Sequence, residues 1–172
     1  MGAPALFDDL MRATVVPALR ELGFRGSGQS FSLPDAVRWE LLGFQRHRLN
    51  HPGSAMFTVN LLCVERADWS AAREAAPSLP ASPSASVSWG PGRHERVGFL
   101  LDPAHDHWWE LRTQDDREVV GQQVVEVLRE LAVPWLVAGD DGAGRPPRGR
   151  VPAVGESWTC PLPGCPMNRF AP

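Results

Sequence analysis

The first apolar positions of the chain recur at helical spacing. Between Leu6 and Leu22 they fall three or four residues apart, which predicts an amphipathic helix with one face toward a core: Phe7, Met11, Val15, Leu19 and Leu22. Pro17 removes a backbone donor, so we expect a kink, or a break with Pro17 near the start of a second short helix. Gly23 suits the left-handed position just past a helix end, so the helix should stop there.

Alternation of apolar and polar residues then predicts strands. Phe31 to Leu33 forms a short strand, and Val37 to His47 pairs with Met56 to Glu65 in a hairpin around the turn RLNHPGSA. Apolar residues occupy both faces of this hairpin, and Gly43 marks a possible bulge where the apolar face switches. We therefore expect both faces of the hairpin to be partly covered.

A second pair of runs alternates in the same way. Val97 to Leu101 and the run HWWELR at 107–112 flank the turn DPAH, which predicts a second hairpin. Asp115, with Glu118 three residues later, predicts the capped start of a closing helix that Pro134 ends or bends. The apolar stripe of this helix is Val120, Val124, Val127, Leu128 and Leu131.

Together these elements predict an α+β fold. We expect an antiparallel sheet of about five strands, made of two hairpins plus a short strand, with the N-terminal and C-terminal helices packed on one face. A single domain spans 4–138 and contains an insertion at 77–92 that is rich in Ser, Pro and Ala and too poor in apolar residues to order itself. Residues 139–172 form a tail rich in Gly and Pro that we predict to be disordered.

Composition narrows the available chemistry. Lys, Ile and Tyr are absent, as expected of a GC-rich genome, so a lysine Schiff base, a P-loop lysine and a tyrosine acid are excluded. The net charge of -3 and the scattered arginines argue against binding to nucleic acid. No basic leader is present and no apolar run approaches the length of about 20 residues that spans a membrane. We expect a soluble cytoplasmic protein that does not bind membranes.

Five polar residues in the central hairpin are the leading candidates for a binding site. Gln45, Arg46 and His47 end the first strand, while Thr58 and Asn60 interrupt the second at a period of two. Gln45 is expected to face the same side as Thr58 and Asn60, where buried amides require partners. Two interpretations are open. The cluster takes partners from a ligand, or it holds the sheet against a helix or the following loop.

Two adjacent tryptophans must point to opposite faces of a sheet. Trp109 is expected in the core. Trp108 shares its face with Glu110 and Arg112, and it is either packed under a neighbouring element or exposed as an anchor for a partner, a use that favours tryptophan. Trp108 and Glu110 therefore join the candidate binding residues.

Side chains that can bind metals occur in two places without a complete ligand set. One short turn holds Asp102, His105, Asp106 and His107, which is also ordinary composition for a solvated turn. Cys160 and Cys165 lie in the tail with no histidine nearby, and Cys63 lies in a strand interior where a thiol is inert. We predict no metal, no cofactor and no catalytic residue at these positions.

Short motifs along the chain carry a resemblance to a known family. They are Leu22 to Phe24 at a helix end, Arg25 to Phe31, Phe44 to Arg46, Phe57 to Asn60, and the pair Trp108 and Trp109 before a closing helix. This pattern resembles a bacterial family catalogued as domain of unknown function 4304, over about Leu6 to Leu136. The chain departs from it where Arg25 is followed by Gly26 and Ser27 instead of further basic residues, and where His47 replaces a small polar residue. The resemblance implies the fold and brings no established activity.

These observations favour a small binding or protein-interaction module over an enzyme. It would act as an immunity-type or regulatory partner of another protein, or it would bind a small ligand. The alternative from another class is a small hydrolase or metal-dependent enzyme that uses His47 or the pair His105 and His107. A third hypothesis is the sensing of small anions by Arg25, Arg46 and Arg48. The oligomeric state stays open.

Overall fold

The computed structural model describes residues 2–87 and 90–138. Its N-terminal helical segment is divided as the position of Pro17 predicts. α1 (Ala3–Leu10) continues into a π-helical turn, η1 (Met11–Val15), and then into α2 (Val16–Glu21). Pro17 lies in the first turn of α2, where its missing N–H costs no hydrogen bond, and the preceding turn is wide enough for its ring. Gly23 follows with a φ of 90°, which confirms the predicted helix end.

The described residues form one six-stranded antiparallel sheet, which confirms the α+β prediction. Its strands are β1 (Arg25–Ser27), β2 (Ser30–Leu33), β3 (Arg38–Arg46), β4 (Ala55–Glu65), β5 (Arg93–Arg96) and β6 (Trp109–Leu111). The order is β1-β2-β3-β4-β5, and β6 also pairs with β4. The central hairpin of β3 and β4 is therefore present as predicted.

The second predicted hairpin is wrong. Val97–Leu100 forms a 3₁₀ turn, η2, and the strand lies just before it, as β5. β5 and β6 do not pair with each other, because β4 has 11 residues and accommodates both short strands along one edge. Between them the chain turns back on itself at Gly98, where a Cβ atom would lie 2.4 Å from the carbonyl oxygen of His105. The segment from 97 to 108 thus leaves the sheet and returns to it.

The remaining helices are α3 (Arg66–Ala75), α4 (Gln114–Val127), the π-helical turn η3 (Leu128–Ala132) and α5 (Val133–Val137). The cap of α4 is Thr113, not Asp115 as predicted, because the Thr113 side chain accepts from the N–H of Asp116 and the Asp116 carboxylate accepts from the N–H of Thr113. Pro134 lies in the first turn of α5, after a π-helical turn, and so repeats the arrangement at Pro17.

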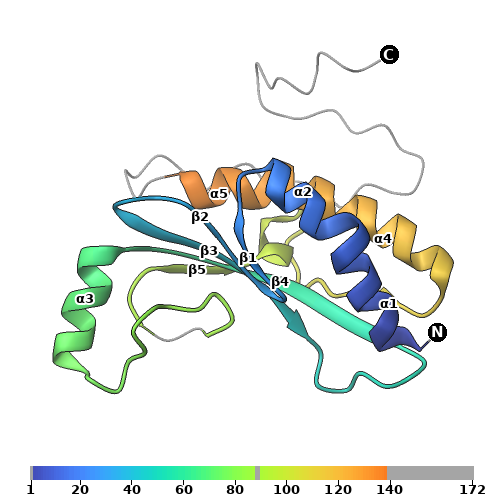
Figure 1. Ribbon diagram of the computed structural model, residues 1–172, viewed down its shortest axis with the longest axis horizontal. Coiled ribbons are helices and arrows are strands. Elements are labelled where there is room, and N and C mark those ends of the chain that lie inside the picture. Colours follow the sequence, from blue (N-terminus) through green and yellow to red (C-terminus); the bar gives the residue numbers. More distant parts are fainter. Residues whose placement is uncertain (1, 88–89, 139–172) are drawn as a thin grey trace, which may run out of the picture.

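Four helices, α1, α2, α4 and α5, cover one face of the sheet, which we call the helix face (Figure 1). Phe57 of β4 lies at its centre with no exposed surface, and its ring centroid is 5.0 Å from that of Phe7 and 5.6 Å from that of Trp109. Burial of one such side chain contributes about 1.5–3 kcal/mol to stability. This face holds the main core of the protein.

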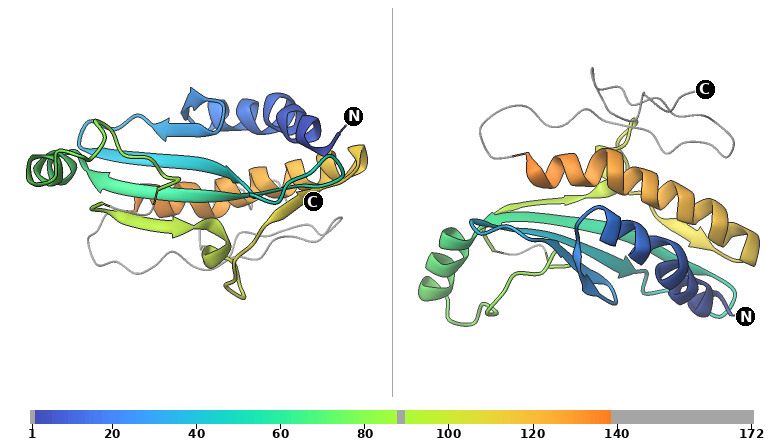
Figure 2. Two further views of the ribbon diagram at one scale, coloured as in Figure 1. Left: turned by 90° about the horizontal axis from the view of Figure 1, so that it is seen from below. Right: turned by 45° about the horizontal axis from the view of Figure 1, so that its top comes forward.

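The opposite face carries a smaller apolar cluster. Trp69 of α3 packs there with Leu62 and Val64 of β4, and its indole N–H donates to the carbonyl oxygen of Pro80 at 3.2 Å. The first part of the predicted insertion, residues 77–87, lies against this face through Ala85, so we call it the strap and the face the strap face. Both views in Figure 2 show α3 at one end of the sheet, apart from the other helices.

The tail at 139–172, with Cys160 and Cys165, lies outside the described residues, and the domain boundaries stay a prediction. Within 2–87 and 90–138, no helix combines the length and the apolar character that crossing a membrane requires.

Candidate functional site

Three of the candidate residues share the strap face, as their alternation predicts. Gln45 is paired with Thr58 across β3 and β4, and Asn60 is paired with Gly43. Thr58 has no exposed surface, and its hydroxyl donates to the carbonyl oxygen of His107 at 2.9 Å. Thr58 thereby ties the returning chain to a stretch of β4 between the segments paired with β5 and β6.

Arg46 and His47 do not join them. Arg46 lies on the helix face, where its guanidinium carbon is 4.4 Å from the centroid of the Phe7 ring and its Nη2 forms an ion pair with Asp8. His47, just past the end of β3, contacts Trp108 edge-on, with ring centroids 4.8 Å apart. Arg46 therefore stabilises the covering helix, while His47 stays near the edge of the strap face.

A third strand completes the polar cluster with Arg96, which is paired with Asn60 across β4 and β5. Asn60 Nδ2 donates to Gln45 Oε1 at 2.8 Å, Arg96 Nε donates to Asn60 Oδ1 at 3.2 Å, and Arg96 Nη2 donates to Gln45 Oε1 at 3.4 Å. We call Gln45, Asn60 and Arg96 the polar triad. Its internal bonds fix the orientation of all three side chains.

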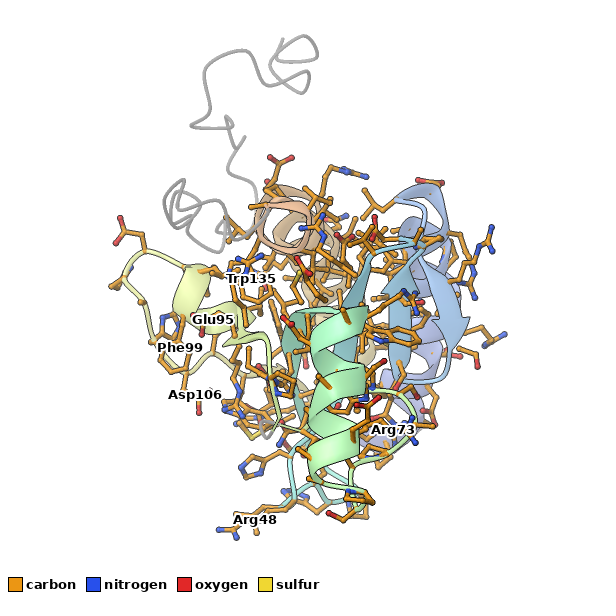
Figure 3. All side chains as sticks on the ribbon, turned by 90° about the vertical axis from the view of Figure 1, so that its left-hand side faces the viewer. Arg48, Arg73, Glu95, Phe99, Asp106 and Trp135 are labelled. Atoms are coloured by element: carbon orange, nitrogen blue, oxygen red, sulfur yellow. The ribbon has the colours of Figure 1, made fainter. Side chains whose placement is uncertain are left out.

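The polar triad lines a cleft of about 500 Å³ between the sheet and the strap. We call this the polar cleft; its further lining includes Ser86 of the strap, His94 of β5 and Phe99 of η2. Phe99 is 39% exposed at the rim. Figure 3 shows Glu95, Phe99 and Asp106 along the same flank of the molecule, from β5, η2 and the loop that follows.

The hydrogen bonds of the triad leave donors unused. Gln45 Oε1 accepts both of its bonds, so the Gln45 amide group points its Nε2 away from them. This nitrogen forms no hydrogen bond with any of the described residues. The polar cleft therefore presents amide N–H groups and the Ser86 hydroxyl to whatever enters it.

The charge of Arg96 is balanced at the flank of the cleft. Arg96 Nη1 donates to Asp106 Oδ1 at 2.6 Å, and the guanidinium carbon lies 5.2 Å from the centroid of the Trp108 ring. Burial of Asp106 opposes ionisation, but the hydrogen bonds from Arg96 and Trp108 prevail and lower the pKa of this carboxyl. Asp106 is thus charged at neutral pH and compensates Arg96.

His94 is the histidine of the polar cleft. Burial lowers the pKa of its imidazole, so the ring is neutral at pH 7. Its Nε2 is shielded from solvent and has no hydrogen-bond partner among the described residues. Because Nε2 has no accessible surface, it does not offer a hydrogen bond to a ligand in the cleft without a shift of the ring.

The other predicted histidines form a separate pair on the returning chain. His105 Nε2 lies 3.1 Å from His107 Nδ1, and the His107 ring stands edge-on to Trp109 with centroids 4.6 Å apart. Burial, helped by the nearby charge of His105, lowers the pKa of His107 to about 4. In the described part of the chain, no group of three or more His, Cys, Asp or Glu side chains is arranged to hold a metal ion.

Glu110 and Trp108 also lie outside the lining of the polar cleft. Glu110 Oε1 accepts from Arg112 Nε at 2.8 Å and from the Ser54 hydroxyl at 2.5 Å, and these two bonds lower its pKa. Trp108 is half-buried between His47 and the guanidinium of Arg96. Trp108 supports the triad from the side, whereas Glu110 ties the start of β4 to β6.

Gly43 is not a bulge, since its pairing with Asn60 continues the regular register. Its lack of a side chain makes room for the strap. A Cβ atom on Gly43 would lie 2.7 Å from the Ser86 hydroxyl oxygen and 3.4 Å from the Ala85 Cβ. Glycine at this position therefore sets how closely the strap approaches the polar cleft.

The three arginines of the anion hypothesis are not brought together. Arg25 lies on β1 at the sheet edge, Arg46 pairs with Asp8 on the helix face, and Arg48 is exposed in the loop after β3. Figure 3 shows Arg48 at one end of the molecule, beyond the flank that carries Phe99.

Sequence reasoning missed His94, Arg96, Ser86 and Phe99. The predicted strand begins at Val97, whereas the strand of the structure spans Arg93–Arg96, where alternation puts His94 and Arg96 on one face. Ser86 and Phe99 gave no signal, because a strap contact and a 3₁₀ turn have no periodic pattern.

Comparison with known proteins gives one match. The family model described as a domain of unknown function (DUF4304) matches residues 15–138, which confirms the resemblance drawn from the motifs. All residues of the polar cleft fall within the matched segment. No curated protein and no solved structure matches the chain.

Proposed function

The chain belongs to the family described as a domain of unknown function (DUF4304), and on that premise we propose that it is a binding module whose ligand enters the polar cleft. The favoured ligand is a segment of another protein, and a small molecule is the alternative. The observation that carries this proposal is the polar triad, which joins three strands at the floor of the cleft.

The free-energy cost of burying such a polar cluster supports a binding role. Asn60 is only 9% exposed, and an apolar residue there would extend the neighbouring cluster of Leu62 and Val64. Buried polar groups stabilise a fold only when every partner is present. Gln45, whose N–H groups are unused, borders a cleft whose volume lies within the range of ligand sites, about 300–1,000 Å³.

Charge and shape narrow the chemistry of the ligand. Asp106 compensates Arg96, and the lining also includes Glu95, so the cleft offers hydrogen-bond donors without a net positive charge. Such donors suit uncharged acceptors, and the carbonyl groups of a peptide segment fit this description. Phe99 at the rim adds an apolar contact of the kind found at protein interfaces.

Binding without turnover accounts for the arrangement better than catalysis. The enzyme hypothesis requires His47 or the pair His105 and His107 in a concave site beside a carboxylate. The histidines of that hypothesis, His47, His105 and His107, do not line the polar cleft. A role as a regulatory or immunity-type partner fits this proposal, because it requires a stable complex and no reaction.

The proposal is tested by comparative capture of partners. The full chain, its Gln45→Ala variant and its Gln122→Ala variant are immobilised, and proteins retained from a lysate of the source organism are quantified. Gln122 is an exposed glutamine on α4 and serves as the matched control. We expect a partner that the full chain and Gln122→Ala retain equally and Gln45→Ala loses at least fivefold, the effect of about 1 kcal/mol.

Equal retention by all three proteins would contradict the proposal. It would also be contradicted by a substrate that the full chain turns over and Gln45→Ala does not. Circular dichroism of each variant separates loss of binding from loss of fold. The cytoplasmic location expected from the sequence stays a prediction, which cell fractionation would test.

A further inference from the structure

We infer that the chain has a second, independent site that binds an oxyanion, at the junction of β1, β2 and the start of α3. A pocket of about 420 Å³ lies there, and its lining includes Arg25, Ser32, Asp35, Trp39 and Arg66. We call it the arginine pocket. It shares no lining residue with the polar cleft and does not depend on the function proposed for that cleft.

Arg66 is held in place by its surroundings. It begins α3 directly after β4, and its guanidinium carbon lies 3.7 Å from the centroid of the Trp39 ring. Its Nε and Nη2 donate to the carbonyl oxygen of Asp35 at 3.3 and 2.9 Å. These contacts leave Nη1 without an acceptor among the described residues, so a positioned donor is available to a ligand.

Arg25 supplies the second positive charge. It lies on the exposed strand β1, paired with Ser32, so that the Ser32 hydroxyl belongs to the same lining. Its guanidinium forms no hydrogen bond or ion pair with any residue in 2–87 or 90–138. Arg25 can therefore turn toward an anion without breaking an existing contact.

The carboxylate in the lining does not cancel these charges. Asp35 Oδ1 accepts from the N–H groups of Val37 and Arg38 at 2.8 and 2.6 Å, and these backbone bonds lower the pKa of the carboxyl. This oxygen is committed to the turn between β2 and β3. Two guanidinium groups thus face one carboxylate, which leaves the pocket positive in a chain of net charge -3.

Two arginines, a hydroxyl and a net positive charge suit an oxyanion, either a phosphate group or a carboxylate. Of the three arginines in the hypothesis of anion sensing, only Arg25 belongs to this pocket. The second arginine is Arg66, in place of Arg46 and Arg48. Arg38 does not contribute, because its Nη2 pairs with Glu40 at 2.8 Å.

The test is a titration of the full chain with inorganic phosphate, followed through the Arg66 Nε–H resonance by NMR. We compare the unmodified protein with Arg25→Gln, Arg66→Gln and Arg73→Gln. Arg73 is an exposed arginine in the last turn of the same helix, outside the pocket, and is the matched control (Figure 3). If Arg66→Gln perturbs the structure of α3, the conclusion rests on Arg25→Gln, because Arg25 is exposed and its substitution should not disturb the fold.

We expect a saturable shift and an affinity for phosphate that Arg25→Gln weakens roughly fivefold, the effect of one charge-assisted contact, while Arg73→Gln leaves it unchanged. Equal shifts with chloride at matched ionic strength would overturn the inference, as would an equal loss in Arg73→Gln. Parallel titrations with acetate distinguish the source of the oxyanion. Tighter binding of phosphate indicates a phosphate-bearing ligand, and tighter binding of acetate indicates a carboxylate, each of which supports the site.

Discussion

The two faces of the central hairpin come from alternating residues of the same two strands, β3 and β4, and have opposite characters. On the helix face, Leu42, Phe44, Phe57, Val59 and Leu61 form a continuous apolar layer that four helices cover. On the strap face, an apolar cluster at one end gives way to the polar triad. Neighbouring residues along one strand thus serve stability on one side and binding chemistry on the other.

The two faces differ in the elements that cover them. The helices bring their own apolar stripes, so the helix face excludes water and its aromatic rings are fully buried. The strap is poor in large apolar residues and covers its face through Leu79 and Ala85, and a cleft stays open beside it. A weakly covered face can hold polar groups near solvent at a smaller desolvation cost.

The largest expected effect lies on the helix face. Phe57→Ala removes a ring with no exposed surface that contacts Phe7 and Trp109 on either side. We expect a loss of about 3–5 kcal/mol in the free energy of unfolding, measured by urea denaturation. A loss below about 1 kcal/mol would mean that the helix face is not the main core.

A smaller loss is expected from the polar triad. Asn60→Leu keeps the size of the side chain but leaves Gln45 Oε1 and Arg96 Nε without their short hydrogen bonds. We expect about 1–3 kcal/mol of destabilisation, measured by the same method. The double variant Gln45→Leu with Asn60→Leu should lose less than the sum of the two single variants, because their contributions are coupled. Strict additivity would show that the triad does not act as a unit.

This contrast also explains what the sequence could predict. The helix face was predictable because the periodic stripes of α1 and α4 and the alternation of β3 and β4 all report burial. The central hairpin and the placement of Gln45, Thr58 and Asn60 on one face followed from the same alternation.

Short elements gave too little pattern. β5 has four residues and β6 has three, and their pairing is set by the length of β4 and by the close contact at Gly98, neither of which alternation reports. Arg96 therefore escaped notice, although it completes the triad. Arg46 was grouped with Gln45 by proximity in sequence, while adjacent strand residues point to opposite faces.

A prediction about pH concerns the edge where the two faces meet. His107 packs against Trp109 of the core, and its pKa falls to about 4 on folding, from about 6.5 in the unfolded chain. Between pH 6.5 and pH 4, His107 is protonated in the unfolded state and neutral in the folded state. The stability from the neutral ring is therefore complete above about pH 6.5 and declines as the pH falls toward 4.

Because the His107 side chain is partly exposed, we expect this decline to amount to about 1–2 kcal/mol, less than the full shift implies. His107→Asn should flatten the dependence of the free energy of unfolding on pH between 7 and 4.5 by that amount, whereas His51→Asn, at an exposed loop histidine, should leave it unchanged. Identical slopes in both variants would rule out His107 as the titrating group.

The smallest effect is expected where the strap meets the sheet. Gly43→Ala places a methyl group 2.7 Å from the Ser86 hydroxyl oxygen, so the Ser86 side chain must move and loosen the strap contact, and we expect about 1 kcal/mol of destabilisation. Adding Ser86→Gly removes the clash and should restore most of this loss, which calorimetry can resolve.

The same pair of variants sharpens the contrast between the faces. Gly43→Ala should speed proteolysis within 77–87 without changing amide exchange in α1 or α4. A uniform change in amide exchange across both faces would show that the strap and the helices open together as one cooperative unit.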